Sequence, residues 1–288
     1  MNKCDFFIVG APKCGTTSVY HYLDEHPDIF LSTPKEVNFF SSVDLLNQSM
    51  YYDDYICKTS DEYDLIFSES NADQIRGEAS VSYLFYENVP SKIIKYNPQA
   101  KILIFLRNPV DRAFSHFLMD SRLGLCDYDF STILHSSFKI PNGSLYYQQY
   151  IELGFYYIQV SRYLNCFKKE NIHLVFLDDL ISDLNGTLHN IFLFLGVDAF
   201  FPDDAKVHNE FSSFKNPFLA YLYKNYNLRK FFSFISPYFL KNFINKQLKS
   251  SYKPHIMPED AEFLKQLYLD DICNLESLIS VDLSRWKS

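Results

Sequence analysis

An apolar run that leads into a glycine-bearing turn places the strongest constraint on this chain. Residues 6–9 are four consecutive apolar residues and predict a β-strand buried on both faces, as in a parallel sheet. Gly10 and Gly15 lie in the turn that follows, and residues 16–25 carry apolar side chains at helical spacing. A strand, a glycine turn and a helix N-terminus direct backbone N–H groups and the positive end of the helix dipole toward one point. We therefore expect this turn to bind an anion, and a phosphate group fits it best.

A second apolar run ends in a charged residue. Residues 102–106 predict another buried parallel strand, and Arg107 follows it directly. Asn108 suits a helix N-cap and Pro109 suits the first helical position, so a helix is expected to begin here. Open α/β sheets bind ligands beyond the carboxyl ends of their strands. Arg107 is therefore expected at the same ligand as the first turn.

The composition limits how such an anion site can be built. The chain has 288 residues, of which 47% are hydrophobic, and its net charge of −8 argues against a general nucleic-acid binder. The cations of an anion site must therefore be gathered locally. No apolar run approaches 18 residues and no signal-peptide pattern precedes the first strand, so we expect a cytoplasmic protein without stable membrane insertion. The six scattered cysteines lack the spacing of a zinc site, so reduced thiols and no metal site are expected.

The first turn has the spacing of a Walker A loop but not its lysine. In G-x-x-x-x-G-K-[ST] the lysine follows the second glycine, whereas here the lysine is Lys13, inside the loop. The pattern P-x-x-G-T-T with an internal lysine resembles the 5′-phosphosulfate loop of sulfotransferases that use 3′-phosphoadenosine 5′-phosphosulfate (PAPS). The resemblance implies that Lys13 is catalytic. It also implies donor binding by Lys13, Cys14, Gly15, Thr16, Thr17 and Ser18.

The second strand and a late basic segment extend the resemblance to the other end of the nucleotide. R-x-P-x-x-R-x-x-S at residues 107–115 resembles the 3′-phosphate site of the same family, whose arginine and serine match Arg107 and Ser115. Arg112 could instead pair with an acid on its own helix. Residues 249–255 loosely resemble the basic loop that closes over PAPS, which implies a role for Lys253.

Two acidic segments resemble the acceptor side of the family. K-E-x-x-F-F at residues 35–40 implies that Glu36 is the catalytic base, with Lys35 beside it, and an attacking hydroxyl or amine does need such a base. G-E-x-S-x-x-Y-L at residues 77–84 resembles a segment that ends a strand and begins a helix, and Glu78 is the second candidate for the base. Ser80 could alternatively cap that helix. Tyr156 is a further acceptor-side candidate, although packing is the simpler role for it.

Three features of the second half of the chain are expected to be structural. Tyr157, Val160, Leu164 and Phe167 repeat at helical spacing and predict the buried stripe of a helix. Residues 200–250, rich in Phe, Tyr and Lys, are interpreted as helical core and lid, with a membrane-surface role as the alternative. The single tryptophan, Trp286, is expected to be a packing plug.

The resemblance extends over nearly the whole chain. It is to the carbohydrate and heparan-sulfate sulfotransferase branch, in a bacterial-type single domain over residues 1–288. It implies an α/β, P-loop-like three-layer fold with a central, mostly parallel β-sheet of about five strands flanked by helices. Such a fold brings the loop and Arg107 to one edge of the sheet.

The function implied is transfer of a sulfuryl group from PAPS to a hydroxyl or amine of a glycan or small-molecule acceptor. PAP is the product, and no metal is required. Two alternatives stay open: a P-loop kinase that uses Asp178, after the apolar run 172–177, for magnesium, and a non-catalytic PAP-binding protein. The residues do not identify the acceptor, and they leave a homodimer open.

Overall fold

The computed structural model describes residues 3–48, 57–200 and 254–287. The contacts of the chain group it into two compact units. The first unit is Met1–Arg112, Phe155–His208 and Tyr268–Ser288, and the second is Ala113–Gly154 and Asn209–Leu267. This grouping does not test whether residues 1–288 act as a single domain, which stays a prediction.

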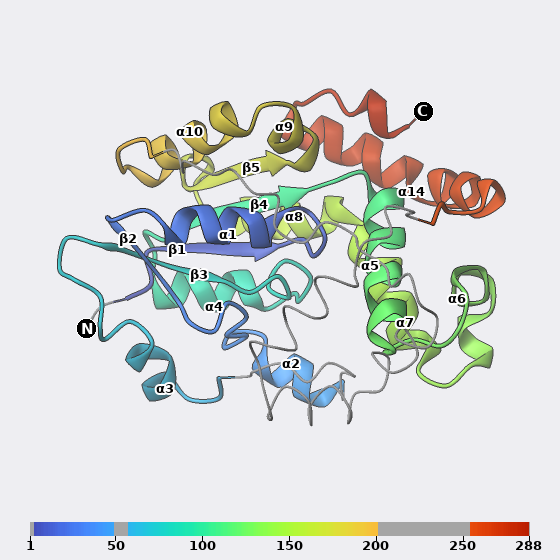
Figure 1. The fold of residues 1–288 in the computed structure, drawn as a ribbon, viewed down its shortest axis with the longest axis horizontal. Helices are drawn as coiled ribbons and strands as arrows, with labels where there is room; N and C mark the ends of the chain where they lie inside the picture. Colours follow the sequence, from blue (N-terminus) through green and yellow to red (C-terminus); the bar gives the residue numbers. More distant parts are fainter. Residues whose placement is uncertain (1–2, 49–56, 201–253, 288) are drawn as a thin grey trace, which may run out of the picture. The chain divides into compact units, whose positions relative to one another are not determined.

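The first unit is built on a five-stranded sheet in which every strand pair is parallel (Figure 1). Its strands are β1 (Phe6–Gly10), β2 (Ile29–Leu31), β3 (Ile75–Ala79), β4 (Lys101–Leu106) and β5 (Ile172–Phe176), in the spatial order β2-β3-β1-β4-β5. The central strand β1 is buried along its whole length, as its unbroken apolar sequence predicts. The predicted α/β fold with a parallel central sheet is confirmed.

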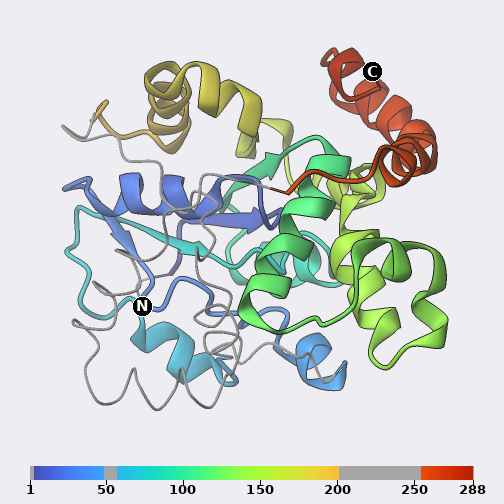
Figure 2. The same ribbon diagram turned by 45° about the vertical axis from the view of Figure 1, so that its right-hand side comes forward.

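Helices cover both faces of this sheet. They are α1 (Thr16–Asp24), α4 (Val89–Tyr96), α8 (Tyr156–Cys166), α9 (Leu177–Ser182) and α10 (Leu184–Leu195), with the short α2 (Ser42–Asn47) and α3 (Ser60–Leu65) between β2 and β3. The helices α4 and α8 contact each other on one face (Figures 1 and 2). On the other face, the ring of His26, just after α1, lies 5.0 Å from that of Phe192 on α10. The opposite placement of α1 and α4 follows from right-handed crossovers that leave the centre in opposite directions.

The described part of the second unit is helical. It contains most of α5 (Pro109–Leu123), then α6 (Phe130–Ser136) and α7 (Gly143–Tyr150), and the first half of α14 (Pro258–Ile279). Two polar pairs join its helices: buried Tyr150 donates a hydrogen bond to buried Asp120 (2.8 Å), and His135 lies 3.0 Å from Asp260.

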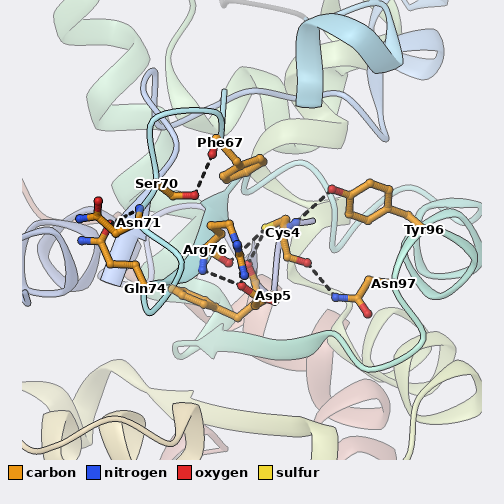
Figure 3. Close-up of polar contacts among 10 residues, drawn as sticks. Cys4, Asp5, Phe67, Ser70, Asn71, Gln74, Arg76, Tyr96 and Asn97 are labelled. Atoms are coloured by element: carbon orange, nitrogen blue, oxygen red, sulfur yellow. Dashed lines mark hydrogen bonds and ion pairs between the residues drawn. The ribbon is translucent and has the colours of Figure 1, made fainter. Parts of the chain in front are cut away.

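The amino-terminal edge of the sheet is fixed by side chains that bind backbone groups (Figure 3). Asp5 accepts hydrogen bonds from the backbone N–H (2.8 Å) and the Nε–H (2.9 Å) of Arg76, which joins β1 to β3. Cys4 is held by Tyr96, whose hydroxyl accepts from its N–H (3.0 Å), and by Asn97, whose amide donates to its carbonyl (2.9 Å). This edge lies opposite the carboxyl ends of the strands, so its polar residues serve the fold.

Two sequence predictions about helices are wrong in part. Val160 and, directly after α8, Phe167 are buried as predicted, whereas Tyr157 is 37% exposed. The buried face of α8 also contains Tyr156, Gln159 and Tyr163. The helix expected directly after Ser80 begins only at Val89, and Ser80 does not cap it.

Among the described residues, no helix is both long and apolar enough to span a bilayer. The segment 201–253, including the predicted lid and Lys253, lies outside the described residues.

Candidate active site

The turn after β1 takes a conformation that its glycines make accessible. Gly10 has φ +139°, Lys13 +69° and Gly15 +88°, and Gly15 is the N-cap of α1. A non-glycine residue with positive φ is uncommon, so Lys13 is held in a sparsely populated conformation by its surroundings. The strand, the turn and the helix of the sequence prediction are therefore all present.

The N-terminus of α1 suits an anion. Gly15 has no side chain with which to cap the first turn, and that turn contains no acidic residue. Thr16 and Ser18 are buried and Thr17 is half-buried. The positive end of the helix dipole is therefore not offset by an acidic side chain of the helix's own first turn.

Arg107 lies beside this turn. It follows β4, the direct neighbour of β1, and its Nη1 donates a hydrogen bond to the carbonyl of Lys13 (3.3 Å). Asn108 Oδ1 accepts from the N–H of Val110 (3.0 Å), so the predicted helix start at Pro109 is confirmed. The chain leaves β1 toward one edge of the sheet and β4 toward the other, so the two strand ends flank a topological switch point, where open α/β sheets bind ligands.

The charges around the turn are cationic although the whole chain is acidic. Cys14 is fully buried, and burial raises the pKa of its thiol to about 11, while the charges of Arg112, Arg107 and Lys13, in that order, act to lower it. Three positive charges therefore act on one atom of the turn. Arg112, for which the sequence left open a pair with an acid on its own helix, is 0% exposed. It is the second arginine of the R-x-P-x-x-R motif, two residues after the first turn residue Val110 of α5.

Glu36 follows β2 and is held from two sides. Its Oε2 accepts a hydrogen bond from the N–H of Val81 (2.9 Å), and its Oε1 lies 2.5 Å from the ammonium of Lys35. The side chain of Glu36 is 29% exposed and that of Lys35 is 17% exposed. An ionised carboxylate has about four acceptor positions, so two contacts leave Glu36 able to accept a proton.

Glu78 lies in a different environment. It is 0% exposed at the end of β3, and burial raises the pKa of its carboxyl to about 7. Its oxygens accept hydrogen bonds from the hydroxyls of Tyr63 (2.6 Å) and Ser80 (2.5 Å). Of the two candidate bases, Glu36 is the one with an accessible carboxylate.

Val81 connects the acceptor-side segment with the first turn. Its N–H binds Glu36, and its carbonyl oxygen would lie 2.7 Å from a Cβ built on Gly10. Leu84, three residues on, donates its N–H to the carbonyl of Val9 (2.7 Å). The first turn (residues 10–15) and the acceptor-side segment (residues 35–40) are therefore joined through the turn after β3.

Three further residues singled out from the sequence lie in different surroundings. Tyr156 is fully buried, with its hydroxyl 3.9 Å from the sulfur of Cys14. Ser115 lies on α5 within the second unit and is half-buried. Asp178, offered as a magnesium ligand, lies on α9 and pairs with Arg285 (3.3 Å).

Comparison with curated proteins finds carbohydrate-modifying relatives. Carbohydrate sulfotransferase 15 of Rattus norvegicus is 26% identical, covering 67% of this chain and 43% of its own. The bifunctional heparan sulfate N-deacetylase/N-sulfotransferase 2 of Homo sapiens is 27% identical, covering 68% of this chain and 22% of its own. The chain thus spans less than half of the length of each relative.

Solved structures and a family model complete the comparison. The crystal structure of a sulfotransferase from Alicyclobacillus acidocaldarius is 28% identical and matches with a TM-score of 0.75 over 100% of both chains. Mouse sulfotransferase SULT7A1, complexed with PAP, shares the fold at 17% identity and a TM-score of 0.54, over 98% of this chain and 90% of its own. A model of the sulfotransferase domain matches residues 3–276. The chain therefore belongs to the sulfotransferase domain family.

Proposed function

We propose that this protein transfers a sulfuryl group from PAPS to a hydroxyl or amine of a glycan or small-molecule acceptor. The observation that carries the proposal is the hydrogen bond of Arg107 to the carbonyl of Lys13 in the turn after β1, where the charge of Arg112 also acts on Cys14, in a chain whose net charge is −8. Cations and a helix N-terminus at one place are the features that bind a polyanionic nucleotide. PAPS carries anionic groups at the 3′ and 5′ positions of its ribose. This suits a site in which one cation, Lys13, follows β1 and another, Arg107, follows β4.

The turn residues would hold the 5′ end of the donor. When bound, PAPS supplies an activated sulfuryl group. The backbone N–H groups of residues 14–17 and the hydroxyls of Thr16 and Thr17 would bind the 5′-phosphate. The ammonium of Lys13 would stabilise the negative charge that develops on the leaving phosphate. Arg107 would bind the 3′-phosphate, and Ser115 and Lys253 stay sequence-based predictions for the same group.

Glu36 would accept the proton of the acceptor. As the acceptor oxygen or nitrogen bonds to sulfur, it must release a proton, and Glu36 is the half-exposed carboxylate next to the first turn. Val81 fixes one oxygen of Glu36, and Lys35 offsets its negative charge. The carbohydrate acceptors named for the curated relatives favour a glycan, so glycans come first in an acceptor panel.

Donor specificity is tested by thermal denaturation with PAP, ADP, ATP and GDP, with and without magnesium. A ligand present at a hundred times its Kd stabilises the folded state by about 2.7 kcal/mol. We expect PAP to raise the melting temperature more than ADP, without a requirement for magnesium. A shift that depends strictly on magnesium and ATP would favour a kinase instead.

Turnover is tested with PAPS, an acceptor panel and the variant Lys13→Ala. Loss of a group that stabilises developing charge costs about 10²–10³-fold in kcat, so we expect at least this loss. The matched control is Lys168→Ala, since the Lys168 side chain is 76% exposed and pairs only loosely with Glu170 (3.8 Å). Near-normal turnover by Lys13→Ala would exclude the assignment. Tight PAP binding without turnover on any acceptor would favour a non-catalytic binder.

A further inference from the structure

Glu78 binds the hydroxyl groups of two residues. Ser80 donates to its Oε1 (2.5 Å), and Tyr63 donates to its Oε2 (2.6 Å). The ring of Phe40 packs against those of Tyr63 (5.4 Å) and Tyr83 (5.7 Å). Because Glu78 is 0% exposed, it can affect an acceptor only through the groups that it binds.

The hydroxyls of Ser80 and Tyr83 bind the backbone of the segment that carries Glu36. The Oγ of Ser80 accepts a hydrogen bond from the N–H of Asn38 (2.9 Å), and the hydroxyl of Tyr83 accepts one from the N–H of Phe40 (3.2 Å). The hydroxyl of Ser80 therefore donates to Glu78 and accepts from Asn38. This arrangement uses both the donor and the acceptor capacity of a hydroxyl group.

The same segment is fixed at its other end by the turn that follows Glu78. Val81 donates to the carboxylate of Glu36 (2.9 Å), and Ser82 donates to the side chain of Asn38 (2.7 Å). Asn38 itself has φ +57°, a conformation that needs support from its surroundings. The direction of the Glu36 side chain therefore depends on how firmly residues 36–40 are held against residues 78–83.

We propose that Glu78 is a positioning residue, which holds residues 36–40 through the hydroxyl of Ser80 and so aims Glu36 at the acceptor. The inference rests on the proposed function, because it concerns the base of that reaction. Hydrogen bonds to an ionised acceptor are shorter and roughly twice as strong as neutral ones. An ionised Glu78 therefore orients the hydroxyl of Ser80, so that a lone pair of this hydroxyl faces the N–H of Asn38.

The structure offers a matched set of variants. Ser80→Ala and Tyr63→Phe each remove one hydroxyl from the carboxyl group of Glu78. Tyr83→Phe removes a hydroxyl that binds the N–H of Phe40. The hydroxyls of Ser80 and Tyr83 bind residues 38–40, whereas the hydroxyl of Tyr63 binds Glu78. Tyr63→Phe keeps the ring that stacks on Phe39 (4.6 Å), so it is the control for loss of a hydrogen bond alone.

The first measurement is amide hydrogen exchange of residues 35–40 in the full chain, which needs no acceptor. We expect faster exchange in Ser80→Ala and Tyr83→Phe, and wild-type exchange in Tyr63→Phe. Unchanged exchange in both test variants, or an equal increase in the control, would overturn the proposal. Hydrogen exchange tests whether these contacts hold residues 36–40, and it needs no active enzyme. If the wild-type protein turned over no acceptor, that result would reject the proposed function but not these contacts.

The second measurement is steady-state turnover with PAPS. A misplaced reacting group can cost up to about 10²-fold, and we expect kcat to fall about tenfold in Ser80→Ala and in Glu78→Gln, with KM for PAPS unchanged. Because Glu78 is inferred to act through Ser80, the double variant should lose less than the product of the single losses. Wild-type kcat in Ser80→Ala, or multiplicative losses in the double variant, would contradict the inference.

Discussion

Glu36 and Glu78 are carboxyl groups on adjoining segments, yet their surroundings assign them different tasks. Glu36 is half-exposed and contacts Lys35, whereas Glu78 is 0% exposed and binds the hydroxyls of Tyr63 and Ser80. Desolvation disfavours the charged form of Glu78 and raises its pKa to about 7, against an ordinary 4.5. Its hydrogen bonds act in the opposite direction without cancelling the effect of burial.

The raised pKa of Glu78 predicts a pH-dependent stability. Between about pH 4.5 and pH 7 the folded state keeps a proton on Glu78 that the unfolded state has released, so the free energy of unfolding falls as pH rises. The stabilisation is complete below pH 4.5 and is lost as pH passes 7, with a total change of at most about 3 kcal/mol. Urea unfolding at pH 5, 6, 7 and 8 measures it.

The variant Glu78→Gln isolates this contribution, because glutamine has no proton to lose. We expect the free energy of unfolding of this variant to change less between pH 5 and pH 8 than that of the wild type. Asp271, whose pKa burial raises to about 6, gives a slope of the same sign that should persist in the variant. Parallel pH profiles for the two proteins would refute the prediction.

At the scale of elements, β1, its turn and α1 form one unit with the turn after β3. The close approach of Gly10 to Val81 depends on the missing side chain, since a Cβ at Gly10 would lie 2.7 Å from the Val81 carbonyl and 2.9 Å from Leu84 Cβ. The Val81 carbonyl belongs to the backbone, so it cannot shift without moving the whole turn. The donor turn and the contact to Glu36 are therefore mechanically coupled.

Gly10→Ala should disturb both sides of the candidate site. We expect the free energy of unfolding to fall by more than about 2 kcal/mol and kcat to fall as Val81 moves, because the φ of +139° and the contacts are both unfavourable for alanine. The control is Gly196→Ala at the end of α10, where φ is +82° and the nearest atom is the flexible Lys101 Nζ at 3.4 Å. It should cost about 1 kcal/mol and leave kcat unchanged. Equal kcat in the two variants would contradict the coupling.

At the scale of the whole molecule, apolar runs predicted the strands but not their neighbours. Residues 6–9 and 102–106 read plainly as buried strands, and they are the central pair β1 and β4. The contact of Glu36 with Val81 joins residues 45 positions apart, and no local pattern specifies such a pair. The sequence therefore offered Glu36 and Glu78 as alternatives, whereas the fold connects them.

The helix α8 shows a second limit of prediction from sequence, which concerns the face of a helix that is buried. Tyr157 was predicted on the buried stripe, yet it is exposed and Tyr156 is buried. Tyrosine has an apolar ring and a polar hydroxyl, so it suits either face and periodicity alone does not set the phase. The start of α8 is instead fixed by a distant residue, Asp271, which accepts the backbone N–H groups of Tyr156 (2.8 Å) and Tyr157 (3.2 Å) from a helix more than 100 residues away.

The end of the described chain closes the first unit around Trp286, as predicted for a packing plug. This residue is 1% exposed, its ring lies 5.8 Å from that of Phe176 and 6.1 Å from that of Tyr156, and its indole N–H donates to Asp178 (3.4 Å). Because these partners lie on β5, α8 and α9, Trp286→Ala should remove packing from three elements and cost about 3–5 kcal/mol. Urea unfolding followed by circular dichroism measures the loss. The control is Phe138→Ala, because Phe138 is 80% exposed and its replacement should change the free energy of unfolding by no more than about 0.5 kcal/mol. A loss below 1 kcal/mol in Trp286→Ala would mean that the chain's end is not part of the first unit's core.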